Sequence, residues 1–379
     1  MRQKQSTASS LTYVRIPDLD LRRDIEEAFL RKDVLIGSSV ITLANNLYSS
    51  KACFVFELLQ NADDNSYDKA TELREVPYVS FQVYPLRIVL ECNEDGFTKE
   101  NLSAICSIGQ SSKSANQGYI GEKGIGFKSV FMAAWKVHIQ SGAFSFYFTY
   151  KTHESGMGMI SPIWEDTDEV LESPLTRITM YLHEEGDADM LAMSCESIRE
   201  QFSEIQETFL LFMKNIRRFC VSVYNEDGDQ TSCATYSIDC PQQKPNYAIL
   251  RKANGLTKEE ANYYHVTTHQ VTNLAKNENR VYSEAEEANH AYSTSQIILA
   301  FPSSETLIPI TKTQDLFVFL LVRPVGFKFI IQADFVTEAN RQDVVNNSLR
   351  NKNILDSISN AFAKAVLQLS KTSVCYGSP

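Results

Sequence analysis

The stretch GEKGIGFKS, residues 121–129, is the feature of the sequence that most constrains the fold. Gly121, Gly124 and Gly126 permit positive φ and a close approach of the backbone to a ligand, so the stretch is expected to be a loop. The apolar run VFMAAW follows and predicts a helix over 128–135. Because a helix N-terminus offers free N–H groups and a positive dipole end, such a loop suits a phosphate group.

The spacing of these glycines fits neither of two common phosphate-binding motifs. A P-loop requires G-x-x-x-x-G-K-[ST], but Phe127 stands in the place of the lysine, and Lys128 and Ser129 come one residue late. The dinucleotide and kinase patterns require G-x-G-x-x-G, and Ser129 occupies the place of the third glycine. Two interpretations stay open at this point: a phosphate loop of another class, or a glycine-rich turn between packed elements.

The composition excludes several classes of protein. The chain has 379 residues, which predicts two domains or three, and 43% of the residues are hydrophobic, enough to form packed cores. A net charge of −11 argues against a general nucleic-acid-binding surface. The eight cysteines include no CxxC pair and the histidines no HExxH motif, which predicts an intracellular protein, in the cytoplasm or nucleus, without a zinc site. No apolar run reaches about 18 residues, so no membrane span is expected.

Hydrophobic periodicity predicts a mixture of helices and strands. In the first part of the chain, helices are expected over 18–32, 38–48, 51–65, 128–135 and 196–214, and strands over 79–85, 87–92, 136–142, 144–150, 176–182 and 217–225. The turn-rich stretch NEDGDQTS then separates this part from a second part that consists mainly of short predicted strands. Beyond it we expect strands over 234–238, 246–252, 295–302, 316–324 and 327–335, a loop or exposed helix over 271–293, and a helix over 347–370.

The predicted helix over 51–65 carries a polar stripe in an otherwise apolar sequence. Glu57, Asn61 and Asp64 follow one another at i, i+4 and i+7, which places them on one face of a helix. Two interpretations fit this stripe. It is either the solvated face of an amphipathic helix or a metal–nucleotide site, in which the asparagine amide oxygen binds magnesium and the glutamate activates a water molecule.

Three further polar segments accompany the stripe. The segment ECNEDGFT, residues 91–98, turns through a glycine directly after a strand. The segment SIGQSSK, residues 107–113, offers hydroxyl groups and Lys113, and Thr176 begins the strand TRITMYL. Each segment alone is compatible with an ordinary turn as well as with a ligand contact.

Taken in order, ELLQNADD, NEDGF, SIGQSSK, GEKGIGFKSVF and TRITMYL resemble the motifs of the Bergerat-fold (GHKL) ATPases, the class that includes gyrase, Hsp90, histidine kinases and MutL. The sequences of these motifs are most similar to those of the NO VEIN-like and sacsin-like, Hsp90-type ATPases of plants and fungi. The similarity covers residues 35–220. It implies an α+β fold that begins with a Bergerat-fold α/β sandwich, a mixed sheet with helices on one face.

The segment DFVTEANRQDVVNNSLRNKNIL resembles the catalytic loop of the Hsp90 middle domain, which delivers an arginine to the terminal phosphate of ATP. Arg341 occupies the place of that arginine, and a guanidinium group suits phosphate charge. The alternative is a surface arginine after a strand. The resemblance implies an N-terminal tail and helix over 1–34, an Hsp90-like ATPase domain over 35–230, and a middle-like α/β domain over 231–379 that carries the catalytic-arginine loop.

The resemblance also assigns roles to individual residues. Glu57 matches the general base, Asn61 the magnesium ligand and Asp64 an acidic neighbour of the pocket. The other matches are all expected to contact the nucleotide: Asn93, Asp95 and Gly96 in the turn, Lys113 near the lid, Gly121, Gly124, Ile125, Gly126 and Phe127 in the phosphate loop, and Thr176 near the adenine. ATP and Mg²⁺ are the implied cofactors.

One position departs from the pattern of this class. Its members usually carry an aspartate in D-x-G-x-G that accepts a hydrogen bond from the adenine amino group, and Cys92 stands in its place. A cysteine is a poor acceptor. Asn93, Glu94 and Asp95 are the candidates to replace the aspartate, and the choice between adenine and guanine stays open.

The resemblance implies a slow, Mg²⁺-dependent ATPase that acts as a conformational switch. Its expected partners are a protein client or further domains of a longer chain, with dimerisation on ATP binding. A nucleotide-sensing scaffold or degenerate ATPase that acts as an interaction module is the alternative, which Cys92 favours and which Glu57 and Arg341 disfavour. A histidine kinase is the third alternative, disfavoured because no phosphoacceptor-histidine helix is seen before the domain.

Overall fold

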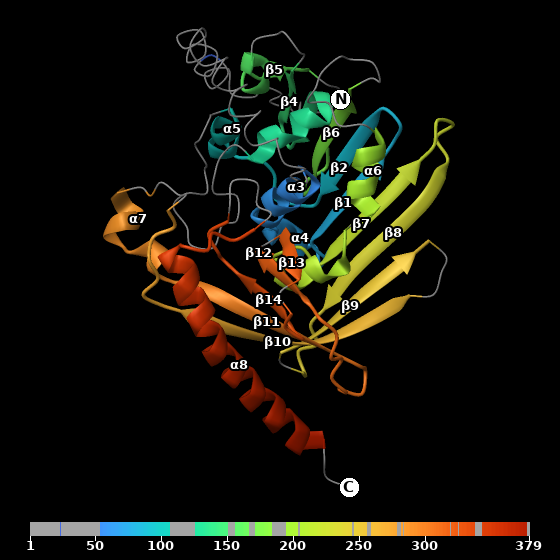
Figure 1. The fold of residues 1–379 in the computed structure, drawn as a ribbon. Coiled ribbons are helices and arrows are strands. Elements are labelled where there is room, and N and C mark those ends of the chain that lie inside the picture. Colours follow the sequence, from blue (N-terminus) through green and yellow to red (C-terminus); the bar gives the residue numbers. More distant parts are fainter. Residues whose placement is uncertain are drawn as a thin grey trace, which may run out of the picture.

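The computed structural model describes residue 23 and residues 54–106, 126–150, 156–166, 171–183, 195–203, 205–244, 246–255, 259–278, 282, 284–318, 320–324, 326–337 and 343–376. These residues form a mixed α/β structure in which one large sheet carries few helices (Figure 1). Within the described ranges the sheet has 14 strands, in the order β13-β12-β14-β11-β10-β9-β8-β7-β1-β2-β6-β3-β4-β5. None of the described helices is long and apolar enough to cross a membrane.

The first part of the sheet is antiparallel except at one pair of strands. Its strands are β1 (Tyr78–Val83), β2 (Arg87–Cys92), β3 (Ala134–Ser141), β4 (Phe144–Thr149), β5 (Ile163–Trp164), β6 (Thr176–Leu182) and β7 (Arg218–Tyr224). Strand β1 pairs antiparallel with β2 and parallel with β7. The expected mixed sheet is therefore confirmed, and the long connection that a parallel pair requires contains the other strands and helices of this part.

Helices cover one face of this part of the sheet. The helical elements are α3 (Phe54–Asp63), α4 (Asp68–Glu72), α5 (Lys99–Ile105), α6 (Cys195–Ser203) and the 3₁₀ helices η1 (Gly126–Met132), η2 (Gly156–Met159) and η3 (Glu207–Phe212). Helices α3 and α6 lie over the same face (Figure 1), and Phe81 of β1 contacts Phe202 of α6 with ring centroids 5.1 Å apart. On the opposite face Arg177 and Glu91 form an ion pair of 2.7 Å. The apolar face of the sheet is therefore the face that the helices cover.

The sheet continues directly into the second part of the chain. The elements there are β8 (Gln230–Asp239), β9 (Tyr247–Asn254), β10 (Glu260–Val271), α7 (Glu284–Ala288), η4 (Ala291–Ser293), β11 (Ser295–Ser303), β12 (Asp315–Val318), β13 (Leu320–Pro324), β14 (Ile330–Ala333) and α8 (Leu349–Tyr376). Strand β8 pairs antiparallel with β7. The boundary expected near residue 230 thus lies at the first residue of β8, inside a continuous sheet.

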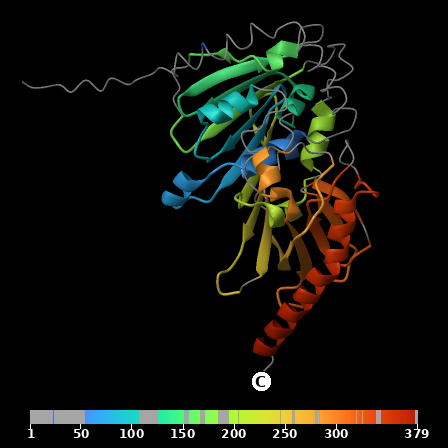
Figure 2. The same ribbon diagram turned by 90° about the vertical axis from the view of Figure 1, so that its left-hand side faces the viewer.

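Helix α8 forms a second core with this part of the sheet. Ile354, Ile358 and Ala361 are buried in one cluster with Ile297 and Leu299 of β11. Figures 1 and 2 show that α8 begins on the side of the second part closer to α3 and runs away from it toward the C-terminus. The first turn of α8 is therefore the end of this helix that lies nearer to α3.

Three expectations about secondary structure are wrong. The helix over 128–135 is η1 followed by β3, because the chain pairs with β6 from Ala134 onward. The helix over 196–214 ends at Ser203, and the short η3 follows; beyond η3 the backbone N–H groups of 214–216 are hydrogen-bonded to a buried carboxylate instead of continuing a helix. The strand over 316–324 is two antiparallel strands, β12 and β13.

Other elements were not expected at all. Strand β10 has polar side chains at many positions, which hides its alternation, but it pairs with β9 on one side and β11 on the other. Helices α4 and α5 are too short to show a period in the sequence. The helices predicted over 18–32 and 38–48 lie outside the described residues, apart from the helical residue Arg23.

Candidate nucleotide-binding site

Helix α3 carries the stripe of predicted site residues. Glu57 and Asn61 lie one turn apart on it, and Asp64 follows its last residue. The side chains of Glu57 and Asp64 are buried, with 7% and 6% of their surface exposed, and Asn61 is half-buried. A solvated helix face would leave both carboxylates in water, so that interpretation is wrong. A buried carboxylate is costly unless polar groups compensate it, and such positions are typical of functional sites.

The turn after β2 is held against the end of α3. The backbone N–H of Asp95 donates to the carbonyl oxygen of Ser66 over 2.9 Å. The hydroxyl of the buried Tyr67 donates to the carbonyl oxygen of Ala62 over 3.0 Å. The NEDGF turn is therefore held by the segment that directly follows ELLQNADD, although the two motifs are separate in the sequence.

The side chains of Asn93 and Asp95 are committed to backbone groups. The amide oxygen of the buried Asn93 accepts a hydrogen bond from the N–H of Tyr78 over 2.8 Å, and its amide nitrogen donates to the carbonyl oxygen of Val76 over 3.2 Å. The carboxylate of Asp95 accepts from two N–H groups at the start of α4, over 3.1 and 2.8 Å. These contacts give both residues a structural role in holding the turn.

Glu94 is the buried carboxylate of the same turn, with 2% of its surface exposed. It lies near the phenol of Tyr67. Burial raises the pKa of this phenol, and the nearby Cys92 and Glu94 raise the pKa further. Cys92 is buried to the same degree. Glu94 thus lies buried in the same turn as Cys92 and stays one of the candidates for the place of the missing aspartate.

Cys92, Thr176 and Ser141 lie side by side on neighbouring strands. Thr176 of β6 pairs with Cys92 of β2 on one side and with Ser141 of β3 on the other. All three side chains are buried on the same face of the sheet, and the hydroxyls of Ser141 and Thr176 share a hydrogen bond of 2.6 Å. The structure thus places Cys92, which stands where the class has an aspartate, next to Thr176. It also adds Ser141 to the residues at this place.

Gly96 allows the turn to approach this row. Its φ is +99°, and a Cβ atom there would lie 3.3 Å from the hydroxyl oxygen of Ser141. The same oxygen accepts a hydrogen bond from the backbone N–H of Phe97 over 2.8 Å. A residue with a side chain would therefore meet both an unfavourable backbone conformation and a crowded neighbour.

Lys128 connects the two described ends of the chain that flank the glycine-rich loop. Its ammonium group donates to the carbonyl oxygens of Ile105, over 2.7 Å, and of Met159, over 2.6 Å, and lies 4.6 Å from the centre of the Phe148 ring. Burial lowers the pKa of Lys128 to about 8. A P-loop lysine reaches toward phosphate instead, so these contacts agree with the spacing that excluded a P-loop.

Part of the predicted phosphate loop lies within the described residues. Gly126 begins η1, and the half-buried Phe127 contacts Phe148 edge to face, with ring centroids 6.4 Å apart. Helix α3 packs against η1. The other expected phosphate contacts, Lys113, Gly121, Gly124, Ile125 and Arg341, lie outside the described residues and stay predictions.

Among the residues that the structure describes, no group of three or more His, Cys, Asp and Glu side chains could hold a metal ion. A magnesium ion that arrives with a nucleotide needs fewer protein ligands, because phosphate oxygens and water complete its shell. Asn61 offers one amide oxygen, one turn from Glu57. The residues present therefore fit a nucleotide-bound magnesium ion and not a site built from protein ligands alone.

Three supporting residues were not expected from the sequence: Asp63, Tyr67 and Ser141. Each is a buried polar residue whose partners lie in other elements. No local signal marked Asp63 or Ser141, since they stand among other polar residues or next to a glycine, in NADDN and QSG. The identity of the partner depends on strand register and on the path of the chain, which a single sequence does not show.

Comparison with known proteins shows similarity to a plant protein and to bacterial chaperones. No family model matches the chain. It is 28% identical over 352 residues to Protein NO VEIN of Arabidopsis thaliana, with 87% of this chain and 12% of that protein covered. It is 31% identical over 185 residues to the chaperone protein HtpG of Helicobacter hepaticus, with 43% of this chain and 29% of that protein covered. The HtpG of Campylobacter jejuni is 27% identical over 195 residues, with coverage of 45% and 31%.

These similarities confirm the resemblance to the Hsp90-like ATPases of the GHKL class. The chain spans 12% of the length of the plant relative and under a third of the two bacterial chaperones. The similarity therefore covers only a part of each of these longer proteins.

Proposed function

We propose that the chain is an ATP-binding, slowly ATP-hydrolysing conformational switch of the Hsp90/GHKL type that depends on Mg²⁺. One observation supports this most. Helix α3 buries Glu57 one turn from Asn61, and the NEDGF turn is hydrogen-bonded to Ser66, in the segment that follows this helix. The fold that we propose is a Bergerat-fold sandwich followed by a domain of the Hsp90-middle type.

The chemistry that we assign to these residues is positioning and electrostatic stabilisation. Glu57 orients a water molecule and accepts its proton, and Asn61 gives its amide oxygen to the magnesium ion that ATP carries. The backbone N–H groups of the loop over 121–127 hold the phosphates. Arg341 stabilises the charge that develops on the terminal phosphate, for which a guanidinium group is well suited.

We assign the adenine end of the pocket to Cys92, Thr176 and Ser141. With a cysteine in the place of the aspartate, the strongest hydrogen bond to the adenine amino group is lost. Glu94, buried in the same turn, takes over the role of acceptor. The preference for ATP over GTP is then weaker than in an ATPase of this class that keeps the aspartate.

The second candidate function is a nucleotide-sensing scaffold without turnover, which Cys92 favours. In both cases the partners that we propose are further domains of a longer chain or a protein client, with dimerisation on ATP binding. The length of the relatives supports further domains, because this chain matches only a part of each.

Release of phosphate from ATP separates the two functions. We expect the wild type to turn over slowly and Glu57→Ala to bind ATP with Mg²⁺ as well as the wild type but not to hydrolyse it. Glu72→Ala, an exposed change on α4, is the control and should alter neither property. Hydrolysis by Glu57→Ala at the wild-type rate would overturn the general-base role, and binding without turnover in the wild type would favour the scaffold.

A further inference from the structure

The segment that carries Arg341 begins and ends at one place in the fold. Thr337 and Val344 form an isolated antiparallel bridge, and the backbone N–H of Val345 donates to the carbonyl oxygen of Val336 over 2.9 Å. We call these four residues the stem. The stem is therefore closed on both sides of Arg341 in the sequence.

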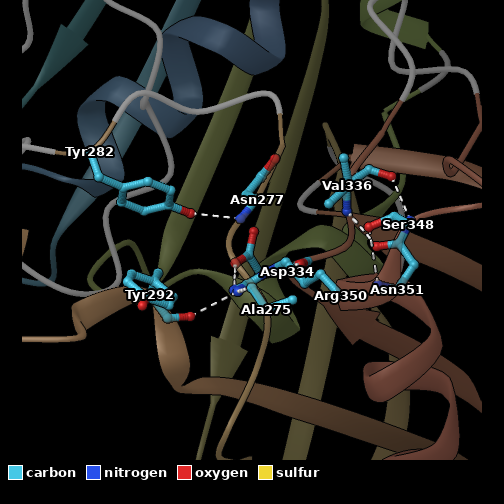
Figure 3. A network of polar contacts seen from close by, with 9 residues as sticks. All are labelled: Ala275, Asn277, Tyr282, Tyr292, Asp334, Val336, Ser348, Arg350 and Asn351. Carbon is cyan, nitrogen blue, oxygen red and sulfur yellow. Dashed lines mark hydrogen bonds and ion pairs between the residues drawn. The ribbon is translucent and has the colours of Figure 1, made fainter. Parts of the chain in front are cut away.

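The side chain of Asn351, in the first turn of α8, binds both sides of the stem, and Figure 3 shows its contact with Val336. Its amide oxygen accepts a hydrogen bond from the N–H of Val336 over 2.7 Å. Its amide nitrogen donates to the carbonyl oxygens of Val336 and Val345, each over 2.8 Å. Only 2% of the residue is exposed, so water does not compete for these groups.

The neighbouring Arg350 fixes the start of α8 itself, again with almost no exposed surface. Its guanidinium forms an ion pair of 2.5 Å with the carboxylate of Asp334, which lies just before the stem. It also donates to the carbonyl oxygens of Ala275, over 3.0 Å, and Tyr292, over 2.8 Å (Figure 3). Arg350 thus ties the helix that presents Asn351 to three other segments of the second part.

We propose that Asn351 is a positioning residue, which sets the stem so that Arg341 is delivered in a defined direction, and that Arg350 holds Asn351 in place. This inference rests on the proposed function, in which Arg341 acts on the terminal phosphate. Arg341 lies between the two sides of the stem in the sequence, so any shift of either side is passed to it. A displacement of about 1 Å of a catalytic group can lower a rate by about 100-fold.

A residue that only stabilised the fold would behave differently from a positioning residue. Loss of a purely structural contact lowers stability and leaves the rate of the folded enzyme unchanged. Loss of a contact that acts through Arg341 lowers kcat, leaves KM nearly unchanged, and has no further effect once Arg341 is removed, because residues that act as a unit are not additive.

The experiment compares Asn351→Ala with Asn360→Ala, an exposed change on the same helix. Amide hydrogen exchange is measured without nucleotide, and kcat and KM for ATP are measured in the wild type and in the Arg341→Ala background. We expect faster exchange at Val336 and Val345 in Asn351→Ala alone, a fall in kcat of about tenfold or more, and KM within about threefold. In the Arg341→Ala background, Asn351→Ala should not slow the reaction further.

Two results would overturn the inference: unchanged exchange at the stem, or an equal fall in kcat whether or not Arg341 is present. If Asn351→Ala does not fold, Asn351→Asp is judged by the same criteria, since it keeps the acceptor for the N–H of Val336 and loses both donated hydrogen bonds. The proposed function fails separately, if the wild type does not hydrolyse ATP or if Arg341→Ala hydrolyses it at the wild-type rate. The exchange data do not depend on turnover and decide in every case whether Asn351 holds the stem.

Discussion

Asp63 and Asn215 hold each other where α3 meets the start of β7. The backbone N–H of Asn215 donates to Asp63 Oδ1 over 2.8 Å, and the Asn215 amide donates back to the Asp63 carbonyl oxygen over 2.7 Å. The N–H groups of Lys214 and Ile216 donate to the same carboxylate, over 2.7 and 2.9 Å, and Asp63 is fully buried. The helix that carries the candidate site is therefore fastened to the middle of the sheet.

The first prediction concerns this contact. Asp63→Asn replaces a carboxylate that accepts three N–H donors by an amide with one acceptor and a misplaced donor. We expect the free energy of unfolding to fall by about 2–3 kcal/mol, the scale of losing buried hydrogen bonds to a charged group. Urea denaturation measures it, with the exposed Asp68→Asn as the control. Equal stability of the two variants would show that the contact is not needed.

The segment between α6 and β7 also contacts the second part of the chain. Phe212, at the end of η3, contacts Phe317 of β12 with ring centroids 5.1 Å apart. Strand β8 also continues the sheet from β7, so a chain cut near residue 230 would expose the hydrogen-bonding edge of β7. Single substitutions therefore test the role of the second part more cleanly than truncation does.

Elements whose signal is local could be predicted from the sequence. Strands β2 and β6 have the expected bounds, because both are short runs rich in β-branched and other apolar residues. Helix α3 ends at Asp63, two residues before the expected end, since fraying and caps do not show in a periodic pattern. The order of the motifs predicted the class of site, and in the structure the NEDGF turn is hydrogen-bonded to Ser66, two residues after ELLQNADD.

Features that depend on register or on distant partners could not be predicted. The pairing of Ser141 with Thr176 follows from the alignment of β3 with β6, and neither strand alone reveals it. The roles of Asn93 and Asp95 as backbone acceptors depend on the chain that lies next to the turn. The end of the helical pattern near 214 reflects the contact of Asp63 with the N–H groups that follow η3, a tertiary effect that the local sequence does not show.

The second prediction tests the magnesium role of Asn61. In the wild type, Mg²⁺ should tighten ATP binding, because the half-buried amide oxygen completes the shell of the ion. In Asn61→Ala the affinities for ATP with and without Mg²⁺ should agree within about twofold, since the protein ligand is gone. Calorimetric titration measures both, with Asn360→Ala as the control. The same enhancement by Mg²⁺ in Asn61→Ala would rule out the assignment.

The third prediction concerns base selectivity. Cys92→Asp should raise the preference for ATP over GTP, because a carboxylate next to Thr176 restores a charge-assisted acceptor worth roughly 1.5–3 kcal/mol, about tenfold to a hundredfold. Cys92→Ser is the matched control and should change little. Glu94→Gln should lower the preference that the wild type has. A preference of the wild type above about a hundredfold, unaffected by Glu94→Gln, would show that another residue reads the base.

The fourth prediction is a pH dependence set by Lys128. Its pKa is lowered by burial to about 8, whereas an unfolded lysine titrates near 10.4. Above pH 8 the unfolded chain therefore binds more protons than the folded one, so the contribution of Lys128 to stability rises with pH. Relative to Lys128→Met, the free energy of unfolding of the wild type should rise by up to about 1.4 kcal/mol per pH unit between pH 8 and 9.

Denaturation curves at pH 7, 8 and 9 measure this slope. The comparison stops at about pH 9, because burial also raises the pKa of the Cys106 thiol to about 12, which acts with the opposite sign at higher pH. Lys364→Met is the control, since the exposed Lys364 also donates to a backbone carbonyl, over 2.7 Å. A difference between wild type and Lys128→Met that stays constant with pH would contradict the buried, titrating ammonium.

The central claim is that this fold binds ATP with Mg²⁺ at α3. The most direct measurement is the free energy of unfolding of the wild type and of Asn61→Ala, with and without millimolar ATP and Mg²⁺. A ligand at 100 times its Kd should add about 2.7 kcal/mol to the wild type, and the variant should gain much less. No stabilisation of the wild type by ATP and Mg²⁺, or equal stabilisation of both proteins, would contradict the claim.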